Sequence, residues 1–322
     1  MPRAAALPPT TAPVRPFSGW PVALEPARWE AEVGLLGITH SEPYAGDPQP
    51  NDQTRAPDAV RARSDIANYG DGAHWDFELG ESLEGTRPGR CLDLGNAVRG
   101  AEDYDAYLAR VTAYARAALA GGMQLLVLGG DHGVTIPVLD ALEALGERVH
   151  VVHVDAHLDW REEVGGVRRG YSSPLRWASE KPWVSGMTQI GLRATGSARR
   201  AEVEAARRYG SRLFPAPDVH RDGIGPVLAA IPDDVPLYIT IDADGLDPTV
   251  MPGVMAPAPG GLHYEQVAPM IAALARRQRV VGMDIVEIAP QFDAANGITC
   301  ITAGRLLVTL LGASGARRRA AR

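Results

Sequence analysis

The chain has 322 residues, 45% of them hydrophobic, and a formal net charge of -7 at pH 7. This length can bury a sizeable core and fits one large α/β domain or two smaller ones, and no internal repeat favours two. Lysines and arginines are scattered without an aromatic platform among them, which argues against a nucleic-acid partner. Cys91 and Cys300 lack CxxC spacing, so we expect neither a disulfide framework nor a thiolate metal site. We therefore expect the protein in the reducing cytoplasm.

The two ends of the chain differ in composition from its middle. Residues 1–30 are rich in proline and are expected to form a flexible arm, ordered in part if Trp20 and Trp29 pack on the body. The arm has no apolar core of signal-peptide length, and we expect no segment long and apolar enough to span a membrane. The basic residues 314–322 are expected to be a solvated tail, which leaves 31–313 as a single domain.

The predicted elements alternate along the chain. A strand at 33–38 is followed by a loop rich in Gly, Pro, Asn and Asp and a short helix at 56–64, and a strand at 91–94 precedes a long helix at 103–120. The pattern then predicts strands at 124–128, 149–154, 188–192, 237–241 and 280–283, and helices at 135–145, 197–209, 223–230, 263–277 and 301–311. Such alternation is typical of a mainly parallel sheet with helices on both faces.

Polar clusters follow four of these strands. The strand at 149–154 ends in Asp155, His157 and Asp159, which would project to one side if the chain stays extended there. Carboxylates and an imidazole converging at a buried strand end need a cation between them. The carboxyl ends of parallel strands share one edge of a sheet, so the clusters should meet there. The other candidate ligands are His132 in GGDHGVT and Asp242 and Asp244 in DADGLDP.

These six side chains offer oxygen and nitrogen ligands and no thiolate. They suit two divalent metal ions that share bridging carboxylates, and manganese is the expected metal because carboxylates dominate. Two ions on the order of 4 Å apart can hold a bridging hydroxide and polarise an electrophile. The alternative is that the six residues are only strand-end caps and ion-pair partners.

The motifs GGDH, DAHLD and DADGLDP, in this order, resemble those of the ureohydrolase family of arginase, agmatinase and guanidino-acid hydrolases. The resemblance runs from about Val33 to Leu311 and implies a catalytic domain over 31–313 with a three-layer α/β/α arginase-type fold and a central, mainly parallel eight-stranded sheet. It also implies a homo-oligomer, a trimer or hexamer, and two Mn²⁺ ions per chain.

Roles carried over by the resemblance fall on matching positions. One manganese would be bound by His132, Asp155, Asp159 and Asp242, and the other by Asp155, His157, Asp242 and Asp244. Glu287, in DIVEIAP, matches the glutamate that pairs with the substrate guanidinium, a charge-assisted contact. The resemblance implies that a bridging hydroxide attacks the amidino carbon and that urea and an amine are released.

Tyr171 marks a departure from the family pattern. Members that hydrolyse guanidines usually carry a proton-shuttling histidine before a small-residue and Pro segment, and GYSSPLRW places Tyr171 there. A phenol, with a reference pKa of about 10, is a poor shuttle at pH 7. Tyr171 would act through a perturbed pKa or a water, or Asp244, His220 or His263 would protonate the leaving group, or the substrate would need no such help.

The substrate loops depart as well. Residues 252–262, PGVMAPAPGGL, stand where arginases and agmatinases typically have Thr-Gly-Thr-Pro, so Val254, Met255 and Ala256 predict a more apolar pocket. This segment is similar to that of formimidoylglutamase, a branch that acts on a formimino group.

Arg161 directly follows DAHLDW, where arginase has a neutral residue. Its guanidinium could bind a substrate carboxylate, or it could pair with Glu162 or Glu163. We therefore expect a binuclear manganese hydrolase that cleaves a linear amidino C–N bond of a small guanidino or amidino compound. Agmatine is the default substrate, guanidinobutyrate is favoured if Arg161 faces the pocket, and a formimino substrate is the third option. A ureohydrolase fold kept as a non-catalytic binding protein is the alternative of another class.

Overall fold

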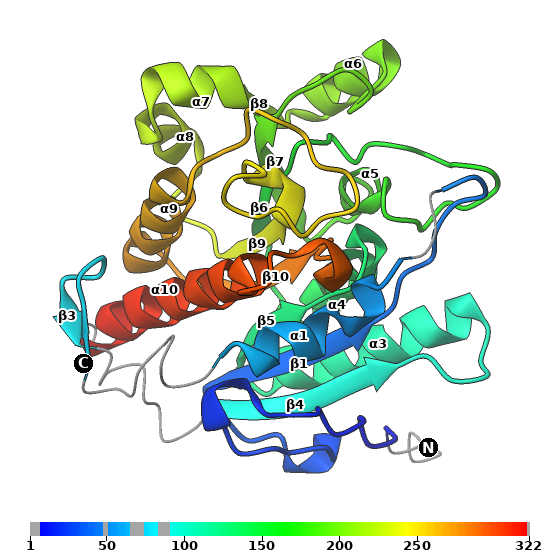
Figure 1. Cartoon of the computed structure of the whole chain (residues 1–322), viewed down its shortest axis with the longest axis vertical. Coiled ribbons are helices and arrows are strands. Elements are labelled where there is room, and N and C mark those ends of the chain that lie inside the picture. Colours follow the sequence, from blue (N-terminus) through cyan, green and yellow to red (C-terminus); the bar gives the residue numbers. More distant parts are fainter. Residues whose placement is uncertain (1–6, 48–50, 65–73, 83–90, 321–322) are drawn as a thin grey trace.

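A central sheet of eight parallel strands organises the protein, as seen in a computed structural model that describes residues 7–47, 51–64, 74–82 and 91–320 (Figure 1). All neighbouring strands in this sheet are parallel, in the order β4-β1-β5-β10-β9-β6-β7-β8. The strands are β1 Val33–Thr39, β4 Cys91–Val98, β5 Gln124–Leu128, β6 Val149–Val154, β7 Val184–Leu192, β8 Arg212–Pro215, β9 Leu237–Asp242 and β10 Val280–Val286. A small antiparallel pair, β2 Trp75–Asp76 and β3 Glu81–Ser82, lies apart from this sheet.

Helices cover both faces of the sheet, which confirms the predicted α/β/α class. Alternate residues of a strand point to opposite faces, and accordingly Leu126 belongs to one hydrophobic core and Leu125 to the other. The first core is closed by α1 Ala56–Ala62, α7 Ala216–Asp222, α8 Gly225–Ala230, α9 Tyr264–Arg277 and α10 Ile298–Ala320. The second is closed by α3 Tyr104–Ala120, α4 Thr135–Ala141, α5 Pro174–Ala178 and α6 Arg200–Tyr209.

The sequence pattern does not predict five of the elements, which are β2, β3, β8, α5 and α7. Strand β8 is four residues long and lies at the edge of the sheet, where Arg212 and Pro215 are tolerated because one side of the strand is unpaired. Helix α5 has five residues and α7 seven, too few for a helical period to stand out. Short 3-10 turns also occur at Phe17–Gly19, Pro26–Arg28, Gln53–Arg55, His132–Val134, Leu142–Leu145, Ala243–Gly245 and Pro290–Phe292.

Two expectations about the C-terminus are wrong, because helix α10 is longer than predicted. It continues through Ala320, and Ser314 and Gly315 are buried, so the segment expected to be a solvated tail is largely the end of a core helix; residues 321 and 322 lie outside the described residues. Its 23 residues are also long and apolar enough to cross a membrane, contrary to prediction, but 83% of the apolar window is buried inside the protein. Helix α10 packs on α9 across one face of the sheet (Figure 1).

The described part of the N-terminal arm, from residue 7, lies along the edge strand β4. Phe17 is 1% exposed, and its backbone N–H donates to Asp93 Oδ2 at 2.9 Å. Thr11 exchanges backbone hydrogen bonds with Asn96 at 2.7 and 2.8 Å. Trp29 is buried, as the sequence allowed. The arm therefore covers unpaired backbone groups of an edge strand, and residues 1–6 lie outside the described part.

Candidate metal centre

Four strands that are neighbours in the sheet carry the polar clusters. Strands β5, β10, β9 and β6 lie side by side, and their carboxyl ends lead into GGDH, DIVE, DADG and DAHLD. The clusters meet because the strands are parallel and adjacent. The six predicted ligands, His132, Asp155, His157, Asp159, Asp242 and Asp244, are thereby brought together.

The six side chains form two adjoining sets. In the first, His132 Nδ1 lies 3.2 Å from Asp155 Oδ2, 3.0 Å from Asp159 Oδ2 and 3.3 Å from Asp242 Oδ2. In the second, His157 Nδ1 lies 3.3 Å from Asp155 Oδ1 and 3.1 Å from Asp244 Oδ2. Asp155 directs one oxygen to each set, as a carboxylate that bridges two metal ions would.

The donor atoms fit divalent metal ions. His132 Nδ1 and Asp159 Oδ2 are buried, and neither makes a hydrogen bond to any described residue. Burial raises the pKa of Asp242 well above its usual value, and the carboxylates of Asp244 and Asp155 raise it further. Buried, mutually repelling carboxylates with free lone pairs are stabilised by cations. The oxygen and imidazole donors match the preference of Mn²⁺ and similar ions.

His132 is oriented by a hydroxyl on the neighbouring strand. Its Nε2 lies 2.9 Å from Thr240 Oγ1, on β9. With Nε2 as the donor of this hydrogen bond, the lone pair of Nδ1 faces the three carboxylates. A metal-ligating histidine commonly fixes its tautomer in this way.

His153 is a residue of the candidate site that the sequence did not single out. Its Nε2 lies 2.8 Å from Asp155 Oδ2, and its Nδ1 lies 3.1 Å from Gln189 Nε2. The Gln189 amide nitrogen donates, because it also donates to Leu158 O at 2.8 Å, a carbonyl that can only accept. His153 Nδ1 therefore accepts and Nε2 carries the proton. Although His153 lies within reach of the first set, it acts as a hydrogen-bond donor that holds Asp155.

Two backbone positions show how tightly the chain is bent at this edge. Asp159 has φ 50° and Glu287 φ 64°, in the left-handed region that non-glycine residues rarely adopt. Such strain concentrates at functional sites, where it aims a side chain. In GGDH, a Cβ on Gly130 would lie 1.7 Å from His40 O, so only glycine fits at this position without a clash.

Glu287 lies beside the ligands. Its Oε1 accepts from the His132 backbone N–H at 2.6 Å, and its Oε2 accepts from Gln53 Nε2. Burial raises the pKa of Glu287 to about 8, and the Asp131 carboxylate contributes to the rise. Glu287 is thus held in a site with an excess of negative charge, which suits a cationic partner such as a guanidinium.

A cavity of about 280 Å³ opens over this cluster. Its lining includes Tyr171 and Arg161, both predicted as substrate residues. From the loop of residues 252–262, Ala256 lines the cavity, whereas the predicted substrate residue Met255 does not. Met255 instead lies 3.9 Å, Sδ to Nε2, from Gln291. The lining consists of His157, Asp159, Trp160, Arg161, Tyr171, Ser172, Gly196, Ser197, Glu202, Asp242, Asp244, Ala256 and Glu287.

Tyr171 and Arg161 both have protein partners. The Tyr171 hydroxyl donates to Asp47 Oδ2 at 2.9 Å. Burial and this carboxylate raise the pKa of Tyr171, so the phenol stays protonated. Arg161 Nη1 donates to Glu202 Oε1 at 2.7 Å, so the predicted alternative pairing with Glu162 or Glu163 is wrong. Glu202 lies on α6, far along the chain.

The other histidines considered as proton shuttles lie elsewhere. His220 on α7 and His263 before α9 contact each other as tilted rings with centroids 5.3 Å apart, and His220 Nε2 lies 3.3 Å from Gly260 O. Both are exposed and neither lines the cavity. Within the described residues, the titratable groups that line the cavity include His157 and Asp244 but neither of these two histidines.

The two adjoining sets of carboxylate and imidazole donors lie at one edge of a parallel α/β/α sheet, and this arrangement could hold divalent metal ions. The chain belongs to the arginase family, whose model matches residues 31–312. This membership confirms the identification made from GGDH, DAHLD and DADGLDP.

Relatives and solved structures agree with the family. N(1)-aminopropylagmatine ureohydrolase of Thermus thermophilus is 40% identical over 61% of this chain, a match that spans 64% of that enzyme's length. Agmatinase of Sodalis glossinidius is 31% identical over 76% of this chain and 75% of its own length. Proclavaminate amidino hydrolase of Streptomyces clavuligerus superposes with a TM-score of 0.79 at 26% identity, covering 96% of this chain and all of that one.

Proposed function

We propose that this chain is a binuclear manganese hydrolase that splits a guanidino compound into urea and an amine. The observation that carries the proposal is the convergence of six metal-type ligands at one edge of the sheet, where four of them and Glu287 line one cavity. Membership of the arginase family and the names of the relatives, which act on agmatine or aminopropylagmatine, support it.

The residues of the chain have separable tasks in this reaction. Bound divalent ions would supply a nucleophile from water at neutral pH and polarise the carbon under attack. Glu287, fixed by the His132 N–H and by Gln53, accepts hydrogen bonds from the guanidinium and holds its plane. Asp244 lines the same cavity and is the carboxylate that we assign to carry a proton to the departing amine.

The wall of the cavity favours an amine tail. Arg161 is neutralised by Glu202 at 2.7 Å, and Asp47 adds a second carboxylate next to Tyr171. The lining pair of Arg161 and Glu202 is therefore neutral, and the Asp47 carboxylate behind Tyr171 gives this side of the cavity a net negative charge, which attracts the ammonium of agmatine or of a longer polyamine. A guanidino acid such as guanidinobutyrate is the second candidate, because Arg161 itself lines the cavity.

A substrate panel tests the proposal. Manganese-loaded protein would be assayed for urea from agmatine, aminopropylagmatine, arginine and guanidinobutyrate, and for formamide from formiminoglutamate. We expect the highest kcat/KM for an amine-tailed guanidine. Formamide release without urea would instead favour the formimino branch. If protein that holds two metal ions turns over none of these substrates, the result would favour a non-catalytic binding protein.

A further inference from the structure

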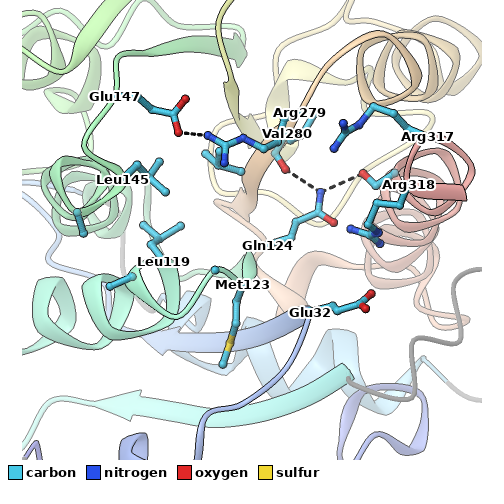
Figure 2. A pocket seen from close by; sticks show the side chains of 15 residues that line it. Glu32, Leu119, Met123, Gln124, Leu145, Glu147, Arg279, Val280, Arg317 and Arg318 are labelled. Atoms are coloured by element: carbon cyan, nitrogen blue, oxygen red, sulfur yellow. Dashed lines mark hydrogen bonds and ion pairs between the residues drawn. The ribbon is translucent and has the colours of Figure 1, made fainter. Parts of the chain in front are cut away.

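A second cavity lies at the opposite edge of the sheet from the metal centre. Its volume is about 380 Å³, larger than the cavity over the metal centre and within the range of small-molecule sites. It is bounded by the first residues of β5 and β10, the end of α3 and the last turns of α10 (Figure 2). The lining residues that matter here are Gln124, Arg279, Ser314, Arg317 and Arg318.

The cavity has an excess of positive charge. Three arginines and two glutamates line it, and one pair is internal, since Arg279 binds Glu147. Arg317 extends from α10 toward the cavity (Figure 2). Its Nε is buried without an acceptor, and its side chain makes no ion pair with any residue in the described ranges. A half-buried guanidinium without a counter-charge is unfavourable, and an anion in the cavity would relieve this cost.

Gln124 supplies the complementary group. It is 6% exposed, and its Nε2 donates to Val280 O at 2.9 Å and to Ser314 Oγ at 3.0 Å, which fixes the direction of the amide (Figure 2). Its Oε1 is buried and has no donor among the described residues. Buried polar atoms in folded proteins nearly always have partners. The lining of the cavity thus includes an arginine Nε without an acceptor and an amide oxygen without a donor, as far as the described residues go.

We propose that this cavity binds a small hydroxylated carboxylate. The carboxylate would pair with the Arg317 guanidinium through charge-assisted hydrogen bonds, and a hydroxyl would donate to Gln124 Oε1 after small side-chain adjustments. A net lining charge of one suits a single carboxylate better than a polyanion. The first residues of β5 and β10 border this site, and the same two strands end at GGDH and DIVE on the other edge of the sheet.

Calorimetry on the full, manganese-loaded chain tests the assignment with gluconate as the probe. Hexanoate lacks the hydroxyls, inorganic phosphate tests for a different oxyanion, and sodium chloride matches the ionic strength. We expect one saturable gluconate site per chain, with weaker binding of hexanoate and of phosphate. Equal binding of hexanoate would overturn the role of Gln124, and binding of phosphate alone would overturn the carboxylate assignment.

Variants of α10 locate the site. Arg317→Gln should weaken gluconate binding by at least about tenfold, and Arg317→Lys, which keeps the charge, by less. Arg319→Gln removes the same charge two residues away, from an arginine that pairs with Glu81, and should leave the affinity unchanged. Manganese content and circular dichroism verify that each variant is folded. No saturable heat beyond the chloride control, or one affinity for wild type and Arg317→Gln, would refute the site.

Discussion

Thr240 and Gln189 are residues outside the ligand set that orient histidines of the candidate metal centre. Thr240 fixes the tautomer of His132, and Gln189 fixes that of His153, which in turn holds Asp155. Neither hydrogen bond is visible in the sequence. His153 lies in an apolar run that predicts only a buried strand, and its partner lies 36 residues further along the chain. Such partners of ligands are as much a part of a metal site as the ligands themselves.

Thr240→Val tests the first of these contacts. Valine has the same shape but no hydroxyl, so the Nε2 proton of His132 loses its acceptor and the tautomer is no longer fixed. We expect manganese affinity in the set around His132 to fall roughly 10- to 100-fold, with little change at the His157 set. Metal titration by calorimetry measures both. Equal weakening of the two sets would indicate general damage to the cluster and not a role in orienting His132.

Arg161 and Glu202 decide the charge of the cavity wall. Arg161→Ala exposes the Glu202 carboxylate, so KM for agmatine should fall and KM for guanidinobutyrate should rise. Glu202→Gln should have the opposite effect, and it retains the capping hydrogen bond from Arg199 N because glutamine serves at that position of a helix. Steady-state kinetics on both substrates provide the measurement. If KM changes in the same direction for both substrates, Arg161 and Glu202 do not discriminate between substrates by the charge of the tail.

Elements whose signals are local follow from the sequence alone. Buried strands such as Val149–Val154 have the predicted bounds, because a continuous apolar run between polar clusters is a strong signal. The meeting of the clusters follows from parallel strand order. What the sequence does not reveal are contacts between distant elements, such as Arg161 with α6, the choice of Ala256 over Met255 in the cavity, and the burial of the end of α10.

Strand β6 also makes the stability of the fold pH-dependent. Burial lowers the pKa of His150 to about 4, and its Nε2 lies 2.9 Å from Thr188 Oγ1. The folded state favours the neutral ring, so as the pH falls below about 6.5 the unfolded chain takes up the proton first. Stability should therefore decline between pH 6.5 and 4, by on the order of 2–3 kcal/mol from this residue.

Urea unfolding of metal-free protein in chelator measures this dependence without interference from metal loss. His150→Gln removes the titrating group and keeps a hydrogen bond within reach of Thr188, so its stability should decline less steeply over the same pH range. His40, whose pKa burial also lowers to about 4, remains and accounts for part of the residual slope. Identical slopes for wild type and variant would show that His150 does not control acid stability.

At the scale of the whole molecule, the unpaired charge of the ligand cluster makes stability depend on metal. Several buried carboxylates repel each other at one edge of the sheet, and bound cations remove that repulsion. Manganese at a concentration of about 1,000 times its Kd should raise the free energy of unfolding by about 4 kcal/mol per site. Denaturant unfolding with and without manganese measures the increase, and an unchanged midpoint would contradict metal binding to the folded state. Sodium chloride at equal ionic strength is the control.

The assembly of the chain stays a prediction. We expect a trimer or hexamer, as the resemblance to ureohydrolases implies, and light scattering coupled to size-exclusion chromatography would determine it. A monomer at micromolar concentration would contradict this expectation without affecting the assignment of the metal centre, because all six ligands come from one chain.

Counting manganese ions is the most direct test of the two-metal centre. Titration of the metal-free chain followed by elemental analysis should give two ions per chain. Asp155→Ala should reduce this number and abolish urea release, because Asp155 gives one oxygen to each set. Asp140→Ala, which removes a half-buried carboxylate outside the cluster that pairs with Lys181 and accepts from Trp177 Nε1, is the matched control and should still bind two. A wild-type chain that binds no more than one ion, or an Asp155→Ala chain that binds two, would contradict the binuclear centre.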